Sequence, residues 1–203
     1  MKKDSMLYVV LFTFAVCAVF TLALAIANEG TKDLVAANAE FATQSAVLGA
    51  LGVPFDGKAD AAARFAETVG AGEAPRSWLA TVGGADYVAV EQSGPGLWGT
   101  IVVILAATPD GERIRGVRVV SQNETPGLGG RIAEPWFLGQ YEGERSPGGR
   151  VGMRAGAESS GAADSDKENG RVDGVSGATR TSQSFAAIVD AALARVKESG
   201  GER

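Results

Sequence analysis

Apolar residues form one unbroken block near the start of the chain. Residues 6–27 read MLYVVLFTFAVCAVFTLALAIA, and no charged side chain lies between positions 5 and 28. At about 1.5 Å of rise per residue, such a block is long enough to cross a hydrocarbon layer of roughly 30 Å as a helix. The pattern predicts that residues 1–28 form an N-terminal tail and a transmembrane anchor.

The charges that flank this block predict its orientation. Lys2 and Lys3 precede it, and no excess of positive charge follows it. Because positive charge is enriched on the cytoplasmic side of membrane helices, we expect a cytoplasmic N-terminus and an extracytoplasmic remainder. A cleaved signal peptide is the alternative, since the AIA before Asn28 resembles a peptidase site, but the block is longer than a typical signal core.

Helical periodicity returns after the anchor. Residues 31–53 carry an apolar stripe formed by Leu34, Phe41, Leu48 and Leu51, and Gly52 is suited to end a helix. A second, shorter helix is expected at residues 60–69, before a break at residues 70–75. We therefore group residues 29–82 as a helical connector.

The period then changes to two, which is typical of strands. Residues 86–92 alternate between apolar and polar, residues 99–107 are a continuous apolar run, and residues 113–121 alternate again. Asp110-Gly111 between the last two segments is a strong hairpin turn signal. The pattern predicts an antiparallel sheet.

A final helix is expected to pack on this sheet. Apolar residues recur there at a spacing of three and four: Phe185, Ile188, Val189, Ala192, Leu193 and Val196. Trp136 and Phe137 are expected in a short helix. Residues 143–171 are rich in Gly, Ser and charge and predict a flexible surface excursion with a short strand at 151–153. The sequence thus predicts one α+β domain, residues 83–203, on a single anchor.

Composition narrows the chemistry. Apolar residues make up 45% of the 203 positions, which is enough for a packed core. The net charge of −5, with no basic stripe, argues against nucleic acid as a partner. The chain has no His and one Cys, which excludes Ser-His-Asp and Cys-His catalysis and the usual zinc and iron–sulfur sites. Any redox or group-transfer work would therefore need a borrowed cofactor.

Two glycine-rich motifs lie in the predicted sheet region. In SGPGLWG, residues 93–99, Trp98 is either a core plug in a tight bend or a wall for a planar ligand, because indole stacks on flat rings. In ETPGLGG, residues 124–130, Pro126 and Gly127 specify a type II turn. Glu124 and Thr125 place polar groups beside that turn, so the motif is either a structural turn or a ligand contact.

The third motif, RVDGVSGATRTSQSF at residues 171–185, precedes the final helix. It offers four hydroxyl groups, on Ser176, Thr179, Thr181 and Ser182. A helix cap by Thr179 or Thr181 is one interpretation. Anion binding is the other, because the amides at a helix N-terminus attract phosphate and Gly177 admits a bulky group. The motif is not a Walker loop, since no Lys follows the glycine.

Taken together on a singly anchored chain, GPGLWG, ETPGLGG and VDGVSGATRTS resemble the FMN-binding subunit family. This family comprises the FMN-binding subunits NqrC, of the sodium-pumping NADH:quinone reductase, and RnfG, of the Rnf electron-transport complex. The resemblance implies that Thr179 carries FMN as a phosphodiester and that a dedicated flavin transferase attaches it. Asp173 matches the start of the motif that the transferase recognises. The implied cofactor-binding residues are Thr179, Ser176, Gly177, Ala178, Thr181, Glu124, Thr125, Pro126, Gly127, Leu128 and Trp98.

The resemblance also implies a role. The chain would be a membrane-anchored electron carrier in the bacterial inner membrane, within an ion-translocating oxidoreductase complex, with other membrane and flavin subunits as partners. We expect basic residues near the flavin ring, with Arg131 and Lys167 as candidates. The motifs favour the quinone-reductase branch and the short chain favours Rnf, so both branches stay open. A non-redox extracytoplasmic ligand-binding or assembly subunit is the rival interpretation.

Overall fold

The computed structural model describes residues 6–72, 74–154 and 163–200. The chain divides into two compact units, residues 1–40 and 41–203. We describe each unit separately.

The first unit lies within helix α1 (Met6–Leu51), which confirms the predicted long apolar helix at the N-terminus. A window of 18 residues in α1 has a mean hydropathy of 2.7, and none of it is buried, so the helix is apolar and long enough to span a membrane. The predicted break between the anchor and the next helix does not occur. No proline lies between residues 28 and 31, and Gly30 alone costs a helix only about 1 kcal/mol.

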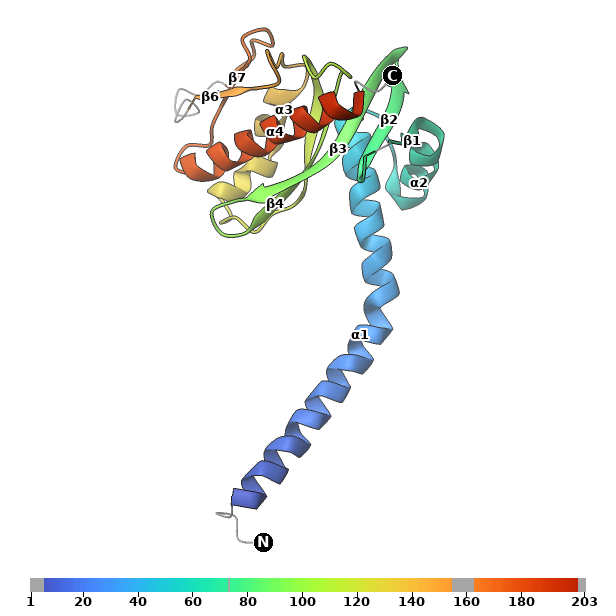
Figure 1. Ribbon diagram of the computed structural model, residues 1–203, viewed down its shortest axis with the longest axis vertical. Helices are drawn as coiled ribbons and strands as arrows, with labels where there is room; N and C mark the ends of the chain where they lie inside the picture. Colours follow the sequence, from blue (N-terminus) through green and yellow to red (C-terminus); the bar gives the residue numbers. More distant parts are fainter. Residues whose placement is uncertain (1–5, 73, 155–162, 201–203) are drawn as a thin grey trace. The chain divides into compact units, whose positions relative to one another are not determined.

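The second unit is built on a five-stranded antiparallel sheet whose strands follow chain order (Figure 1). The strands are β1 (Val69–Ala71), β2 (Ser77–Val82), β3 (Ala85–Pro95), β4 (Thr100–Ala107) and β5 (Ile114–Ser121). The predicted hairpin joins β4 to β5, where Gly111 has a φ of +65° and Asp110 Oδ1 accepts a hydrogen bond from Glu112 N at 3.0 Å. The sheet expected from the period-two pattern is thus confirmed.

One face of the sheet is covered by α4 (Thr179–Gly200), as Figure 1 shows. The side chains that α4 buries against the sheet include Phe185, Ile188, Val189, Ala192, Leu193 and Val196, which are the residues that the sequence predicts. On the strands, Val90, Val103 and Leu105 belong to the same core. This face also receives a ring cluster of Phe137, Tyr141 and Phe185.

The opposite face is covered by the end of α1 and by α2 (Gly57–Thr68). Small side chains dominate here, with Ala89 and Ala106 of the sheet packed among Ala46 and Ala50 of the helix. Since both faces of β4 are covered, its sequence is a continuous apolar run instead of an alternating one.

The remaining elements surround the α4 face. They are η1 (Gly129–Ala133), α3 (Pro135–Tyr141), β6 (Gly152–Arg154) and β7 (Arg171–Asp173), and the last two pair in parallel. Helix α3 contains Trp136 and Phe137, as expected.

Residues 69–82 differ from the helical connector in which the sequence analysis placed them, because they form β1 and β2. Ser77 pairs with Val90 and Val82 pairs with Ala85, so this segment extends the sheet beyond β3. The hairpin between β2 and β3 turns at Gly83 and Gly84, whose φ angles are +61° and +81°. A Gly-Gly pair between two strands is a sequence signal for such a turn.

Residues 143–171 also differ from the flexible excursion expected of them, as far as the structure describes this segment. Glu144, Ser146 and Val151 are buried. Glu144 Oε1 accepts hydrogen bonds from the amides of Gly170 at 2.8 Å and Arg171 at 3.2 Å, which fastens the two ends of the segment together. The expected short strand is present as β6. Residues 155–162 lie outside the described residues.

Candidate functional site

The loop between β3 and β4 carries the first glycine-rich motif at the surface. Gly96 N donates to Gly99 O at 2.7 Å and closes a tight turn. Leu97 and Trp98 are 51% and 72% exposed, so Trp98 is not the core plug that one interpretation of the motif favoured. The turn instead holds two large apolar side chains in solvent.

The second motif forms the predicted turn ahead of η1. Leu128 N donates to Thr125 O at 3.1 Å, and Gly127 between them has a φ of +74°, as the third residue of a type II turn requires. Leu128 is 47% exposed. Here too the turn presents an apolar side chain to solvent.

The third motif leads into α4, and its hydroxyl groups have different environments. Ser182 Oγ accepts from Val175 N and donates to Ala178 O, both at 3.0 Å, so this side chain fastens the loop to the first turn of the helix. Thr179 is exposed at the start of α4. Gly177 has a φ of +78°, a conformation that favours glycine.

Glu124 connects all three motifs. Its Oε1 accepts hydrogen bonds from the amides of Leu97 and Trp98, both at 2.9 Å, and its Oε2 accepts one from Thr181 Oγ1 at 2.6 Å. The side chain is only 5% exposed. Burial raises the pKa of this carboxyl, but the hydrogen bonds from Thr181, Trp98 and Leu97 outweigh it and bring the pKa below its ordinary value. Glu124 is therefore a buried, ionised carboxylate.

The three loops thus meet at the N-terminus of α4. The side chain of Leu128 also reaches the third motif, since a Cβ placed on Gly177 would lie 3.4 Å from Leu128 Cδ2. Around Thr179, the predicted site residues divide by exposure. Trp98, Thr125, Pro126, Gly127, Leu128 and Gly177 are exposed, Ser176 is half-buried, and Glu124, Ala178 and Thr181 are buried.

Comparisons with known proteins agree with this arrangement. Residues 96–194, which contain nearly all of the three motifs, match the family model of the FMN-binding domain. A stretch of 92 residues is 39% identical to the NqrC subunit of Na(+)-translocating NADH-quinone reductase from Neisseria meningitidis, and covers 44% of this chain and 34% of that protein. The same subunit of Haemophilus ducreyi is 36% identical over 104 residues, or 50% of this chain and 38% of that protein.

The chain belongs to this family of FMN-binding subunits. It spans little more than a third of the length of the curated relatives that it matches.

Solved structures of family members show the same fold. The crystal structure of the corresponding reductase subunit from Parabacteroides distasonis aligns with a TM-score of 0.65 at 21% identity, over 82% of this chain and 95% of that one. The structure of Shewanella oneidensis NqrC aligns with a TM-score of 0.60 at 22% identity, over 76% of this chain and 96% of that one. These likenesses confirm the predicted α+β fold.

The residues at the N-terminus of α4 suit the phosphate of an FMN. The first helical hydrogen bond runs from Ser182 N to Ala178 O at 3.0 Å, so the amides of Thr179, Arg180 and Thr181 precede the helical ladder. Amides in that position attract anions, and the helix dipole adds about half a positive charge. Exposed Thr179 places a hydroxyl at the same point.

The surroundings of Thr179 suit the flavin ring. Leu97, Trp98 and Leu128 are the large apolar side chains exposed in the described part of residues 41–203. They come from the two loops that Glu124 and Leu128 connect to the third motif. Exposed apolar side chains gathered beside a phosphate-binding helix end match a ligand with a flat ring and a phosphate.

Other residues of interest lie away from this point. Lys167 Nζ donates to the carbonyls of Gly139 and Gln140, at 2.9 and 2.8 Å, and so caps the end of α3. Arg131 lies over the ring of Trp136 at 5.3 Å and pairs with Glu134 at 3.2 Å. Within the described residues, these contacts keep Lys167 on α3, whereas Arg131 remains close to the second motif in sequence.

Asp173, which matches the start of the transferase motif, is buried. Gln140 bonds its backbone on both sides, with Gln140 Oε1 accepting from Asp173 N at 2.8 Å and Gln140 Nε2 donating to Asp173 O at 3.1 Å. Asp173 Oδ1 pairs with Arg154 Nε at 2.7 Å. Asp173 therefore fixes the path of the chain into the third motif.

Sequence reasoning missed two residues of the site. Leu97 received no role beside its neighbour Trp98, although an apolar residue between glycines in a turn has no core to join. Ser182 had no assigned purpose, because its two backbone partners become neighbours only when the loop folds back on the helix.

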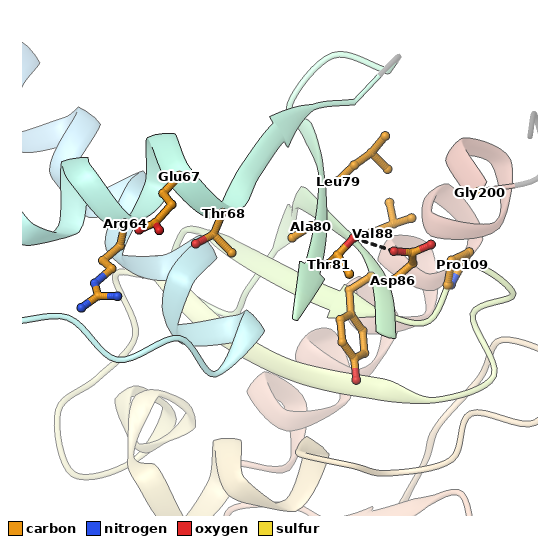
Figure 2. A pocket seen from close by; sticks show the side chains of 11 residues that line it. Arg64, Glu67, Thr68, Leu79, Ala80, Thr81, Asp86, Val88, Pro109 and Gly200 are labelled. Atoms are coloured by element: carbon orange, nitrogen blue, oxygen red, sulfur yellow. Dashed lines mark hydrogen bonds between the residues drawn. The ribbon is translucent and has the colours of Figure 1, made fainter. Parts of the chain in front are cut away.

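A separate cleft of about 480 Å³ lies between α2, the β2–β3 hairpin and the end of α4 (Figure 2). Thr81 donates to Asp86 across the hairpin at 2.7 Å in its wall. None of the predicted cofactor-binding residues lines this cleft. The cleft is thus distinct from the place where the three motifs meet.

Proposed function

We propose that the chain carries FMN as a phosphodiester on Thr179 and relays electrons as a subunit of an ion-translocating oxidoreductase of the Nqr or Rnf type. One observation carries the proposal: the three motif loops converge around an exposed threonine at the N-terminus of a long helix. The membership of the FMN-binding family supports it.

In this proposal the phosphate lies at the start of α4, with Thr179 Oγ as the ester oxygen. Thr181 Oγ1 already donates its proton to Glu124. We therefore assign the phosphate contacts to the backbone amides of residues 179–181 instead of the Thr181 hydroxyl. Gly177, with its positive φ, and Ala178 leave room for the ester beside the helix.

The ring would contact the apolar side chains that the first two loops expose. Trp98 offers a flat indole, Leu97 and Leu128 offer aliphatic surface, and the backbone of the turn at residues 125–128 offers polar groups. FMN, when bound, supplies the redox chemistry that a chain without His or metal ligands lacks. The protein then provides position and shielding.

The anchor determines where this chemistry takes place. With Lys2 and Lys3 before the apolar block, we propose a single pass through the bacterial inner membrane and a domain on the extracytoplasmic side. The relatives are subunits of Na(+)-translocating NADH-quinone reductase. We accordingly propose membrane and flavin subunits as partners and a flavin transferase for maturation.

In-gel fluorescence tests the attachment. Protein from its own host, separated under denaturing conditions, should fluoresce as a flavoprotein, because the ester survives unfolding. Thr179→Ala should be dark, whereas the matched control Ser176→Ala should still fluoresce. A dark wild-type band would favour the rival, a non-redox ligand-binding or assembly subunit.

A further inference from the structure

Glu124 has a role that differs from the cofactor contact implied by its motif. Its oxygens already accept from Leu97 N, Trp98 N and Thr181 Oγ1. A carboxylate has about four acceptor positions, so the protein itself occupies most of them. We infer that Glu124 is a positioning residue, which holds the Trp98 loop and the first turn of α4 in fixed register beside Thr179.

The inferred role explains two glycines of the motifs. A Cβ on Gly96 would lie 2.5 Å from Glu124 Oε1, and a Cβ on Gly129 would lie 2.9 Å from Glu124 Oε2 and 2.7 Å from Thr181 Oγ1. Side chains at these two positions would displace the carboxylate. Gly96 and Gly129 therefore make room for Glu124, and their presence does not require contact with a ligand.

The contacts of Glu124 couple segments that are far apart in sequence. Thr181 is 57 positions from Glu124, and Leu97 is 27 positions from it in the other direction. A buried carboxylate that loses a donor remains charged and poorly solvated, so separating one loop weakens the site of the others. The three segments are thus held as one unit through a single side chain.

The consequence concerns the relation of Trp98 to Thr179. Thr181 lies two residues after Thr179 in the first turn of α4, and the Trp98 amide is bonded to the same carboxylate. Glu124 thereby sets where the exposed indole stands relative to the exposed threonine. For the flavin this inference rests on the proposed function, but the coupling of the loops does not.

Hydrogen exchange on the full chain in detergent tests the coupling without any flavin. In a Thr179→Ala background, Thr181→Val removes the hydroxyl and keeps the shape of the side chain. We expect the amides of Leu97 and Trp98 to exchange on the order of tenfold faster, although they lie on another loop. Thr181→Ser, which restores the donor, should return the exchange to the parent rate.

Ser182→Ala is the matched control, because Ser182 is the neighbouring buried hydroxyl on the same helix. It should speed exchange at Val175, whose amide it binds, and leave Leu97 and Trp98 unchanged. Unchanged exchange at Leu97 and Trp98 in Thr181→Val, or equal acceleration in Ser182→Ala, would overturn the inference.

A second measurement uses chains with Thr179 intact. Thr181→Val should retain the flavin mass on Thr179 and shift the visible absorption of the flavin, and Thr181→Ser should restore the wild-type spectrum. A wild-type spectrum in Thr181→Val contradicts the positioning role. Absence of flavin mass in the wild-type chain would instead contradict the proposed function and leave the exchange result standing.

Discussion

At the scale of single residues, the third motif separates the roles of its hydroxyl groups. Thr181 donates to Glu124, Ser182 fastens the loop to the helix, and Thr179 remains exposed. The sequence could predict that a helix begins here and that its start suits an anion. It could not predict the partner of Thr181, because that partner lies 57 positions away.

The lowered pKa of Glu124 gives a pH-dependent contribution to stability. Since the pKa in the folded state lies below its ordinary value, the contribution is fully present above about pH 4.5 and is lost as the pH falls through the folded pKa. At neutral pH, Glu124→Gln should unfold at lower urea, with a loss of roughly 2 kcal/mol, because it removes charge-assisted hydrogen bonds.

Urea titrations of wild type and Glu124→Gln at a series of pH values between about 7 and 3 measure this difference. The gap in unfolding free energy should narrow as the pH falls below about 4.5, because wild-type Glu124 then becomes neutral as well. A gap that stays constant over the series would show that ionised Glu124 does not stabilise the fold.

At the scale of elements, the end of α1 packs unusually close to the sheet. A Cβ on Gly116 in β5 would lie 2.6 Å from Ala50 O. Gly116→Ala should therefore destabilise the domain by about 1–3 kcal/mol through overpacking. A Cβ on Gly139 in α3 would meet no atom within 4 Å, so Gly139→Ala should be neutral or slightly stabilising.

Thermal unfolding of the two variants under identical conditions provides the comparison. Equal midpoints for Gly116→Ala and the wild type would contradict the close packing of α1 on β5.

The elements also show how far periodicity can predict a fold. The β4–β5 hairpin and α4 follow from alternation, the Asp110-Gly111 turn and the helical stripe, since each depends on local pattern. β1 and β2 escaped prediction, because β1 is only three residues long and gains its stability by pairing with β2. The composition of residues 143–154 predicts flexibility, yet Glu144 and Ser146 pack through backbone partners distant in sequence.

At the scale of the whole molecule, the account joins one apolar helix to one flavin-binding domain. Because only Cys17 is present in the chain, topology can be probed with a single added cysteine. Glu198 is exposed near the end of α4. Glu198→Cys should react with a membrane-impermeant maleimide in intact spheroplasts, if the domain is extracytoplasmic.

The parent chain is the control for this labelling, since Cys17 lies within the apolar block and should stay unlabelled from the outside. Reaction of Glu198→Cys only after lysis of the spheroplasts would place the domain in the cytoplasm.

The central claim is that Thr179 carries FMN, and peptide mass tests it most directly. Trypsin cleaves after Arg171 and Arg180, and the peptide of residues 172–180 contains Ser176 and Thr179 as its hydroxyl side chains. In protein from its own host, this peptide should be heavier by FMN less one water, with fragmentation placing the added mass on Thr179. An unmodified peptide, or the mass on Ser176, would contradict the account.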